Sequence, residues 1–134
     1  MEKIKEGAVF FVTWTKLKIR IHFSVQNLYP RERQIWWVNL GYNIGVEMNG
    51  KNEKFERPVL VLKRFNEDSC LVVPLSTKIK NERYHLHFKN SKGQLVSANF
   101  SQIKSISIKR FIRKIEKMNP RDFEKSKEFL KESI

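Results

Sequence analysis

Few residues of the chain have the types and spacing that catalysis or metal binding usually requires. The sequence has one cysteine, Cys70, and three histidines, of which His85 and His87 alternate on one predicted strand. This set offers no group of ligands at zinc spacing, and there is no paired-carboxylate motif of the two-metal type. We expect His85 and His87 to be partly exposed or hydrogen-bonded; gripping a phosphate or relaying a proton is the alternative. The sequence therefore predicts no metal site and no cofactor.

Other catalytic motifs are absent from the sequence as well. It contains no Gly-rich phosphate loop and no GxSxG elbow, and Cys70 lies in the apolar run SCLVVPL, without the electropositive setting of a nucleophile. A lone cysteine also excludes an internal disulfide, which favours the cytoplasm. No stretch approaches the roughly 18 apolar residues of a spanning helix, and the start MEKIKEGAVFFVTW has acidic residues and no clear cleavage site. We expect neither secretion nor membrane insertion.

The charge of the chain points to an anionic partner. It has 27 Lys and Arg against 14 Asp and Glu, a formal net charge of +13 that is spread along the sequence. A small domain needs only a modest net charge for solubility, so this excess suggests a further purpose. Aromatic residues such as Trp36 and Trp37 accompany this excess of positive charge. The alternative is that both tryptophans are structural, one buried in the core and the other packed against a neighbouring element. The combination predicts binding of single-stranded nucleic acid, in which cations follow phosphates and aromatic faces stack on bases.

The elements that must position such a site are mostly short strands. We predict strands in the segments IWWVNL (35–40), RPVLVLKRF (57–65), CLVVPLST (70–77), YHLHFK (84–89) and QLVSANF (94–100). They are rich in branched and aromatic residues and are separated by the turn signals GYNIG, NEDS and NSKG. Five short strands joined by polar loops predict a small barrel or half-barrel.

A helix is predicted near each end of the chain. In residues 10–23 the run LKIRIHF alternates like a strand, but we favour a helix that packs on the main domain. Its apolar residues recur at three- and four-residue spacing: Phe10, Trp14, Leu17 and Ile21. Near the C-terminus, Asn119 is a suitable N-cap and Pro120 a suitable first residue, and Asp122 is an acidic capping partner. Met118 and Phe123 are expected to form a hydrophobic staple, and the predicted buried stripe is Phe123, Leu130 and Ile134. SIKRFIRKI (107–115) is predicted to form a short helix or turn.

The order of five sequence blocks resembles the PemK/MazF family of toxin endoribonucleases. The blocks are IWWVNL, GVE followed by a polar loop, RPVLVL, VVPLST and SQIKSISIKRF, and they run from about Gln34 to the C-terminus. The resemblance implies an α+β fold that is mainly β, a small SH3-like barrel of the Kid/MazF/CcdB type with a C-terminal helix. It also implies a homodimer whose paired sheets form an RNA-binding groove. We expect residues 1–33 to be an N-terminal extension that packs on a barrel domain of residues 34–134.

The resemblance also assigns candidate catalytic residues. The family's Arg-Pro motif matches Arg57 and Pro58, its strand-end hydroxyl matches Ser76, followed by Thr77, and its loop glutamate matches Glu47. RNA supplies its own nucleophile, the 2′-hydroxyl, so a protein need only orient it, move protons and stabilise charge on the phosphate. A guanidinium suits that stabilisation, the two hydroxyls can donate hydrogen bonds to the phosphate, and Glu47 could act as a base or orient its loop. The candidate RNA-binding residues are Lys51, Lys54, Lys78, Lys80, His85, His87 and Gln102.

The activity implied is that of a type II toxin, a metal-independent endoribonuclease acting on single-stranded RNA. Its expected antagonist is an antitoxin with an acidic, disordered tail that folds onto the basic groove. Two positions depart from the family pattern, because Ser101 stands where some relatives have an acid and Ser107 where many have Asp. A proton-transfer role for the first acid would then be absent, and Arg57, Ser76 or a histidine would have to replace it. The alternatives are a nucleic-acid binder without activity and a CcdB-like gyrase poison on the same barrel; the Arg57, Ser76 and Glu47 set argues against the second.

Overall fold

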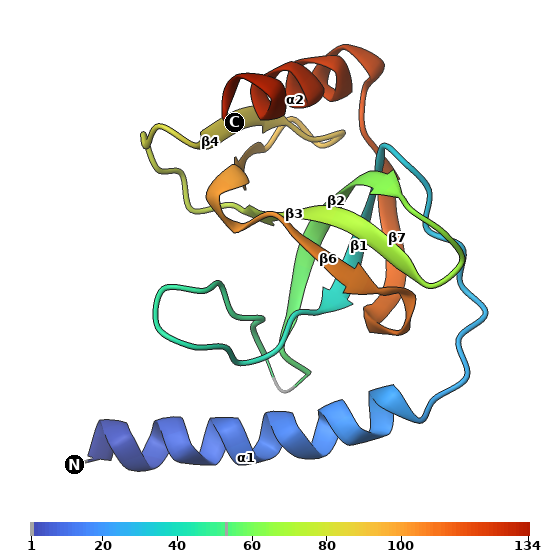
Figure 1. The fold of residues 1–134 in the computed structure, drawn as a ribbon. Coiled ribbons are helices and arrows are strands. Elements are labelled where there is room, and N and C mark those ends of the chain that lie inside the picture. Colours follow the sequence, from blue (N-terminus) through green and yellow to red (C-terminus); the bar gives the residue numbers. More distant parts are fainter. Residues whose placement is uncertain (1, 53) are drawn as a thin grey trace.

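The computed structural model describes residues 2–52 and 54–134, which contain two α-helices, two short 3-10 helices (Phe100–Gln102 and Ile108–Arg110) and seven strands. Helix α1 (Glu2–His22) and helix α2 (Pro120–Glu132) lie on opposite sides of the sheet (Figure 1). The strands are β1 (Gln34–Asn39), β2 (Glu56–Arg64), β3 (Ser69–Ser76), β4 (His85–Lys89), β5 (Leu95–Asn99), β6 (Lys104–Ser107) and β7 (Phe111–Lys117). Neither helix of this part of the chain is both long and apolar enough to cross a membrane.

The sheet is antiparallel and divides at β3. Its strand order is β4-β5-β3-β2-β1-β7, and β6 pairs with β3 outside this path. One edge of β3 pairs with β2; along the other edge the first half pairs with β6, and the end pairs with β5 through Leu75↔Ala98 and Ser76↔Ser97. The predicted fold, a mainly β barrel with a C-terminal helix, is confirmed. The division of β3 brings Ser76 to the place where the β4–β5 hairpin leaves the barrel.

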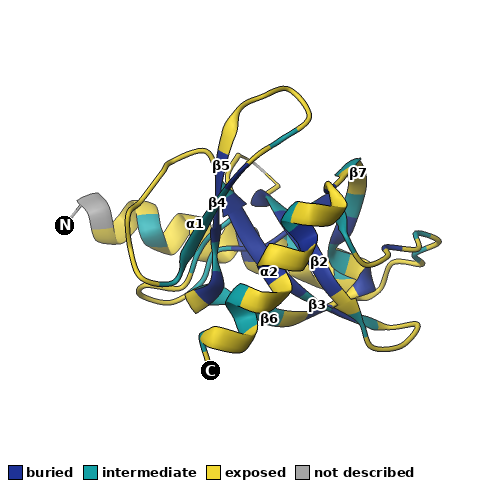
Figure 2. Cartoon of the chain, turned by 90° about the horizontal axis from the view of Figure 1, so that it is seen from above, coloured by how far each residue is buried: buried dark blue, intermediate teal, exposed yellow. Residues whose placement is uncertain are grey.

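The core consists of two apolar clusters on the two faces of the central strands. On β2, Val59 and Val61 belong to the cluster inside the barrel, whereas Leu60 and Leu62 belong to the cluster beneath α2. All four are at most 5% exposed, which explains the continuous apolar run in the sequence, since a strand buried on both faces shows no alternation. Figure 2 shows the buried residues concentrated in the strands, with the outer surface of α2 exposed.

Helix α1 packs on the barrel mainly through Trp14. Its indole is 6% exposed and lies over Gly41, whose φ of +96° and lack of a side chain make the contact possible: a Cβ there would come within 2.5 Å of the ring. Phe55 contacts the indole edge-on at 5.7 Å, and the Arg110 guanidinium lies 5.6 Å from it. The predicted helix is confirmed, but it begins already at Glu2 and ends at His22, and Phe10 remains 48% exposed beside Tyr42.

The Asn119–Pro120 start of α2 is as predicted, and so is its buried stripe for Phe123 and the partly buried Leu130, but not for Ile134. The side chain of Asn119 accepts a hydrogen bond from the Arg121 amide at 2.8 Å, and Pro120 is the first helical residue. Met118 and Phe123 both belong to the core cluster beneath α2. The expectation for Ile134 was wrong, because the helix ends at Glu132 and leaves that residue 95% exposed.

The prediction of a short helix or turn over residues 107–115 was wrong for most of that segment. Only Ile108–Arg110 forms a single 3-10 turn; Ser107 ends β6, and Phe111 begins β7. Strand β7 pairs with β1, and register shifts interrupt this ladder between Ile35 and Trp36 and again between Trp37 and Val38. Such irregularities break the two-residue alternation that identifies a strand. The structure therefore has two strands beyond the five predicted.

Candidate functional site

Arg57 is held rigidly near the start of β2. Its Nε donates a hydrogen bond to the Asn49 carbonyl oxygen at 2.7 Å, and its Nη1 donates to the Leu75 carbonyl oxygen at 3.2 Å. The residue is 9% exposed, and this burial lowers the pKa of the guanidinium from its usual value. An arginine nevertheless stays charged at neutral pH. The two bonds use two of its five N–H donors and fix the plane of the group.

A cavity of about 410 Å³ lies beside this guanidinium. Arg57, Pro58, Ser76 and Thr77 all line it, so β2 and the end of β3 bring the predicted Arg-Pro motif and the strand-end hydroxyls to one place. Ser76 Oγ accepts a hydrogen bond from the Lys78 amide at 3.1 Å, which fixes the turn after β3. The apolar part of the wall comes from three strands, β1, β3 and β7, and from the β4–β5 hairpin: Ile35, Trp37, Leu75, Phe88, Val96 and Ile115.

The two neighbouring tryptophans of β1 have different environments. Trp36 is 6% exposed in the barrel core, whereas Trp37 is half-buried and lines the cavity. The Arg113 guanidinium lies 5.1 Å from the Trp37 ring, and its Nη2 is 3.4 Å from Glu56 Oε2. An aromatic face beside one guanidinium group, in a cavity that Arg57 also lines, is a suitable surface for a nucleobase.

Of the four lysines predicted to bind RNA, the structure brings one to the cavity. Lys51 lines it, in the loop before β2. Lys54, Lys78 and Lys80 are exposed and do not line it. Together with Arg57, Ser76 and Thr77, Lys51 forms the part of the predicted site that the fold assembles.

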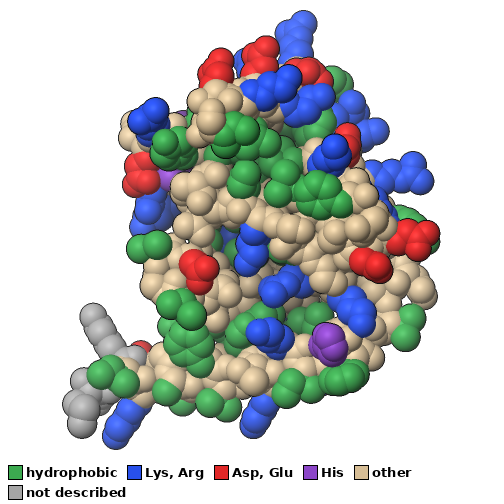
Figure 3. Space-filling view, in the orientation of Figure 1, with side chains coloured by type: hydrophobic (Ala, Val, Ile, Leu, Met, Phe, Trp, Pro, Cys, Tyr) green, Lys and Arg blue, Asp and Glu red, His purple; other side chains and the backbone are tan. Residues whose placement is uncertain are grey.

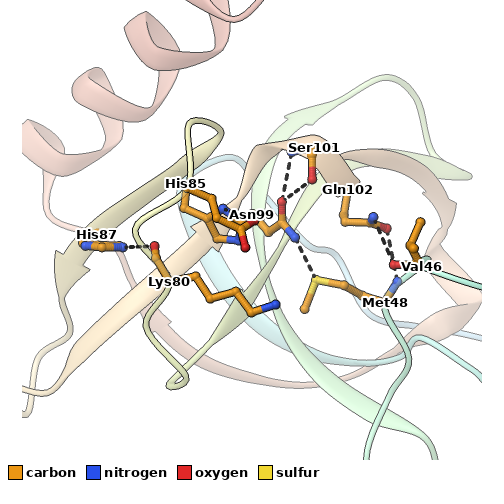
Figure 4. Close-up of polar contacts among 9 residues, drawn as sticks. Val46, Met48, Lys80, His85, His87, Asn99, Ser101 and Gln102 are labelled. Atoms are coloured by element: carbon orange, nitrogen blue, oxygen red, sulfur yellow. Dashed lines mark hydrogen bonds and ion pairs between the residues drawn. The ribbon is translucent and has the colours of Figure 1, made fainter.

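Glu47 and Gln102 lie at a second, smaller pocket of about 250 Å³. Gln102 Oε1 accepts a hydrogen bond from the Met48 amide at 3.1 Å, and its Nε2 donates to the Val46 carbonyl oxygen at 3.3 Å (Figure 4). Glu47 Oε1 accepts from the Ile44 amide at 3.1 Å. Both side chains therefore stabilise the loop between β1 and β2, and the structure does not bring either to the Arg57 cavity.

The two histidines of β4 also lie outside the cavity. The His87 Nε2 is 2.9 Å from the Lys80 carbonyl oxygen, and it must be the donor because a carbonyl can only accept (Figure 4). His85 Nδ1 is 3.6 Å from Glu82. His87 pairs with Ser97, and Ser97 pairs with Ser76, so the three side chains share one face of the sheet.

Comparison with known proteins gives the family of the chain. The model of the PemK-like, MazF-like toxin of type II toxin-antitoxin systems matches residues 31–134. The chain belongs to this family.

Among the solved structures that are similar to this toxin are the following two. One is described as an endoribonuclease in complex with its cognate antitoxin from Mycobacterial species; it has a TM-score of 0.60 and 15% identity, and the match covers 78% of this chain and 94% of that chain. The other, described as the crystal structure of an Mtb toxin, has a TM-score of 0.49 and 19% identity over 58% of this chain and 92% of that chain. At these identities the first likeness shows the fold alone. The search of curated proteins gave no significant match.

No site role was predicted from the sequence for three features in or near the cavity: Trp37, the Glu56–Arg113 pair and Ser97. Trp37 was considered only as a general aromatic residue, although its position two residues after Ile35 places both on one strand face. Glu56 and Arg113 are far apart in the sequence, and no spacing rule connects them. Ser97 is 1% exposed, and in residues 2–52 and 54–134 its hydroxyl has no hydrogen-bond partner.

Proposed function

We propose that this toxin is an endoribonuclease that cleaves single-stranded RNA in the cavity beside Arg57. The observation that carries the proposal is the placement of one guanidinium. Two backbone carbonyl oxygens, of Asn49 and Leu75, hold it on the wall of the cavity that Ser76 and Thr77 also line. A rigid cation and two hydroxyl donors around one space suit a phosphate that gains negative charge during the reaction.

The proposed reaction uses the nucleophile of the RNA itself. The 2′-oxygen forms a bond to phosphorus and loses its proton, while the bond from phosphorus to the 5′-oxygen breaks and that oxygen gains a proton. The products are a 2′,3′-cyclic phosphate and a free 5′-hydroxyl. Arg57 stabilises the charge on the non-bridging oxygens, and Ser76 and Thr77 donate hydrogen bonds to them. The step needs no metal ion and no cofactor.

The apolar wall of the cavity provides a site for the base next to the reacting phosphate. The volume of about 410 Å³ falls in the range of small-ligand pockets. Trp37 offers an aromatic face for stacking, and Lys51 lies at the edge of the cavity, where it can meet a neighbouring phosphate. Outside the cavity, the RNA strand would be contacted by Lys54, Lys78 and Lys80. The surrounding loops would be held by Glu47, His85, His87 and Gln102.

The family also supports proposals on the assembly of the toxin. We expect a homodimer, and we expect a cognate antitoxin whose acidic segment occupies the basic cleft. A net charge of +13 favours such a partner, because complementary charge speeds association and opposes binding of wrong partners. We further expect the protein to act in the cytoplasm, where its substrate is found.

The decisive experiment is incubation of the purified toxin with a long RNA in EDTA, followed by analysis of the ends. We expect discrete cuts with cyclic phosphate and 5′-hydroxyl ends. Arg57→Ala should abolish them while circular dichroism shows a folded protein. Arg121→Ala, which removes an exposed arginine at the start of α2, is the matched control and should cut like the wild type. Full activity of Arg57→Ala would reject the assignment, and RNA retention without cuts would support a non-catalytic binder.

A further inference from the structure

The face of α1 that is turned away from the barrel carries a row of exposed aliphatic residues. Val9, Val12 and Ile19 are 61%, 55% and 55% exposed, whereas Trp14 on the opposite face is 6% exposed. Figure 3 shows hydrophobic side chains along this outer edge of the helix, interrupted by Lys or Arg side chains. A helix with apolar residues on both faces is normally covered on both. The barrel covers only one face of α1.

The spacing of the outer face is that of a helix-pairing surface. Lys5, Val9, Val12, Lys16 and Ile19 follow one another at intervals of four, three, four and three residues. This is the alternation of the a and d positions of a heptad, and it keeps all five side chains on one side of a helix that pairs with another. We call this set the outer seam. Lys5 and Lys16 are exposed, so both seam lysines are accessible.

The lysines within the seam decide what kind of partner fits. A second copy in parallel would place lysine against lysine, and an antiparallel copy would bury lysines against aliphatic residues. A lipid surface prefers an uninterrupted apolar face with its cations at the flanks, whereas Lys16 lies between Val12 and Ile19. An acidic helix satisfies both features, because its carboxylates pair with the lysines and its apolar residues cover the aliphatic ones.

We propose that the outer seam of α1 binds an acidic amphipathic helix of a partner protein, forming a two-helix coiled coil on the outside of the barrel. The insertion of Trp14 over Gly41 holds α1 in place before the partner arrives, which lowers the ordering entropy lost on binding. The family model matches from residue 31 onward, so α1 lies outside it. The proposal concerns a surface whose residues do not line the cavity, and it stands whether or not the toxin cuts RNA.

The probe that tests the proposal is a synthetic, dye-labelled peptide of about three heptads, with Leu and Ile at its a and d positions and Glu facing Lys5 and Lys16. Fluorescence anisotropy measures its binding to the whole toxin. We expect Lys16→Glu to weaken binding about tenfold. A peptide with Lys at the facing position should restore affinity for this variant. Lys131→Glu, an exposed charge reversal of equal size on α2, is the matched control and should bind like the wild type.

A second variant separates the seam from general electrostatics. Val12→Ser with Ile19→Ser removes exposed aliphatic contacts, leaves the charge unchanged and should weaken peptide binding at least about tenfold. A peptide of the same composition in shuffled order should bind no better than this double variant. Equal losses for Lys16→Glu and Lys131→Glu, or equal binding of the shuffled peptide, would overturn the proposal. Two other results with the double variant would also overturn the proposal, if its peptide binding is unchanged. One is loss of binding to phosphatidylcholine–phosphatidylglycerol vesicles, and the other is a smaller mass in sedimentation than that of the wild type.

Discussion

Replacing Arg57 by lysine tests whether the planar guanidinium, and not its charge alone, is required. The native group bonds the Asn49 and Leu75 carbonyl oxygens through Nε and Nη1, and its other donors remain for the cavity. A lysine keeps the positive charge but presents one ammonium at the end of a flexible stem. It cannot reach both carbonyl oxygens and a phosphate in a fixed geometry, so Arg57→Lys should lose rate with little change in overall electrostatics.

The expected losses of cleavage rate and of folding stability both follow from these contacts. The loss of one preorganised donor to a transition-state oxyanion typically costs about 10²–10³ in rate, or about 2.7–4 kcal/mol. One buried carbonyl oxygen left without its donor costs about 1–3 kcal/mol of folding stability. We therefore expect a rate loss of two to three orders of magnitude and a destabilisation of about 1–3 kcal/mol in the Arg57→Lys variant.

Single-turnover cleavage of a short RNA, with the toxin in excess, measures the chemical step for wild type and Arg57→Lys. Urea denaturation followed by circular dichroism measures the stability and confirms that the variant is folded under assay conditions. A single-turnover rate within about twofold of wild type, under 0.5 kcal/mol of barrier, would show that charge alone suffices. That result would refute the argument that the two carbonyl oxygens aim the guanidinium.

Three further predictions test the surroundings of the site. Trp14→Ala should release α1 from the barrel, since truncating a buried tryptophan costs about 3–5 kcal/mol; limited proteolysis would show faster cleavage within α1, and unchanged protection would contradict the anchoring role. Ser76→Ala should lower kcat about 10²-fold with little change in KM. If Thr77→Ala loses more kcat than Ser76→Ala, the hydroxyl that bonds the phosphate is that of Thr77. Burial and the nearby Arg110 lower the pKa of Lys104, so the unfolded chain holds this proton more tightly and the charged form destabilises the fold. Lys104→Met should raise the Tm at neutral pH, and its advantage should shrink as the pH rises through the lowered pKa towards the ordinary lysine value; an advantage that grows there would contradict the sign.

The elements that the sequence predicted correctly are those in which local and tertiary requirements agree. Strand β2 is a run of branched residues that is buried on both faces, and α2 begins at an Asn-Pro pair that satisfies its first amides. β7 was mispredicted because two register shifts interrupt its pairing with β1, each with an extra residue in β7, and only the paired strands reveal them. Ile134 was mispredicted because the periodicity of α2 was extended beyond the residue at which the helix ends.

The candidate site was predictable only where a residue carries its own chemical signal. The Arg-Pro pair and the strand-end hydroxyls have such a signal, and the fold brings Arg57, Ser76 and Thr77 to one cavity. The groups that aim Arg57 are backbone carbonyl oxygens of Asn49 and Leu75, which every residue possesses and no sequence pattern marks. Gln102 looked like an RNA ligand by its position in a family block, yet its side chain amide bonds the loop backbone at Val46 and Met48.

The ambiguity of the first segment has a physical cause in the structure. Residues 10–23 carry apolar side chains on the face that meets the barrel and also on the outer seam, so the helical period is weak and LKIRIHF alternates like a strand. Trp14 resolves the ambiguity, because only a helix places this indole over Gly41 while it turns Val12 and Ile19 away. A solvent-facing surface under no other constraint would favour polar residues at those two positions. Their exposure beside Lys16 is therefore most simply explained by a partner that covers them.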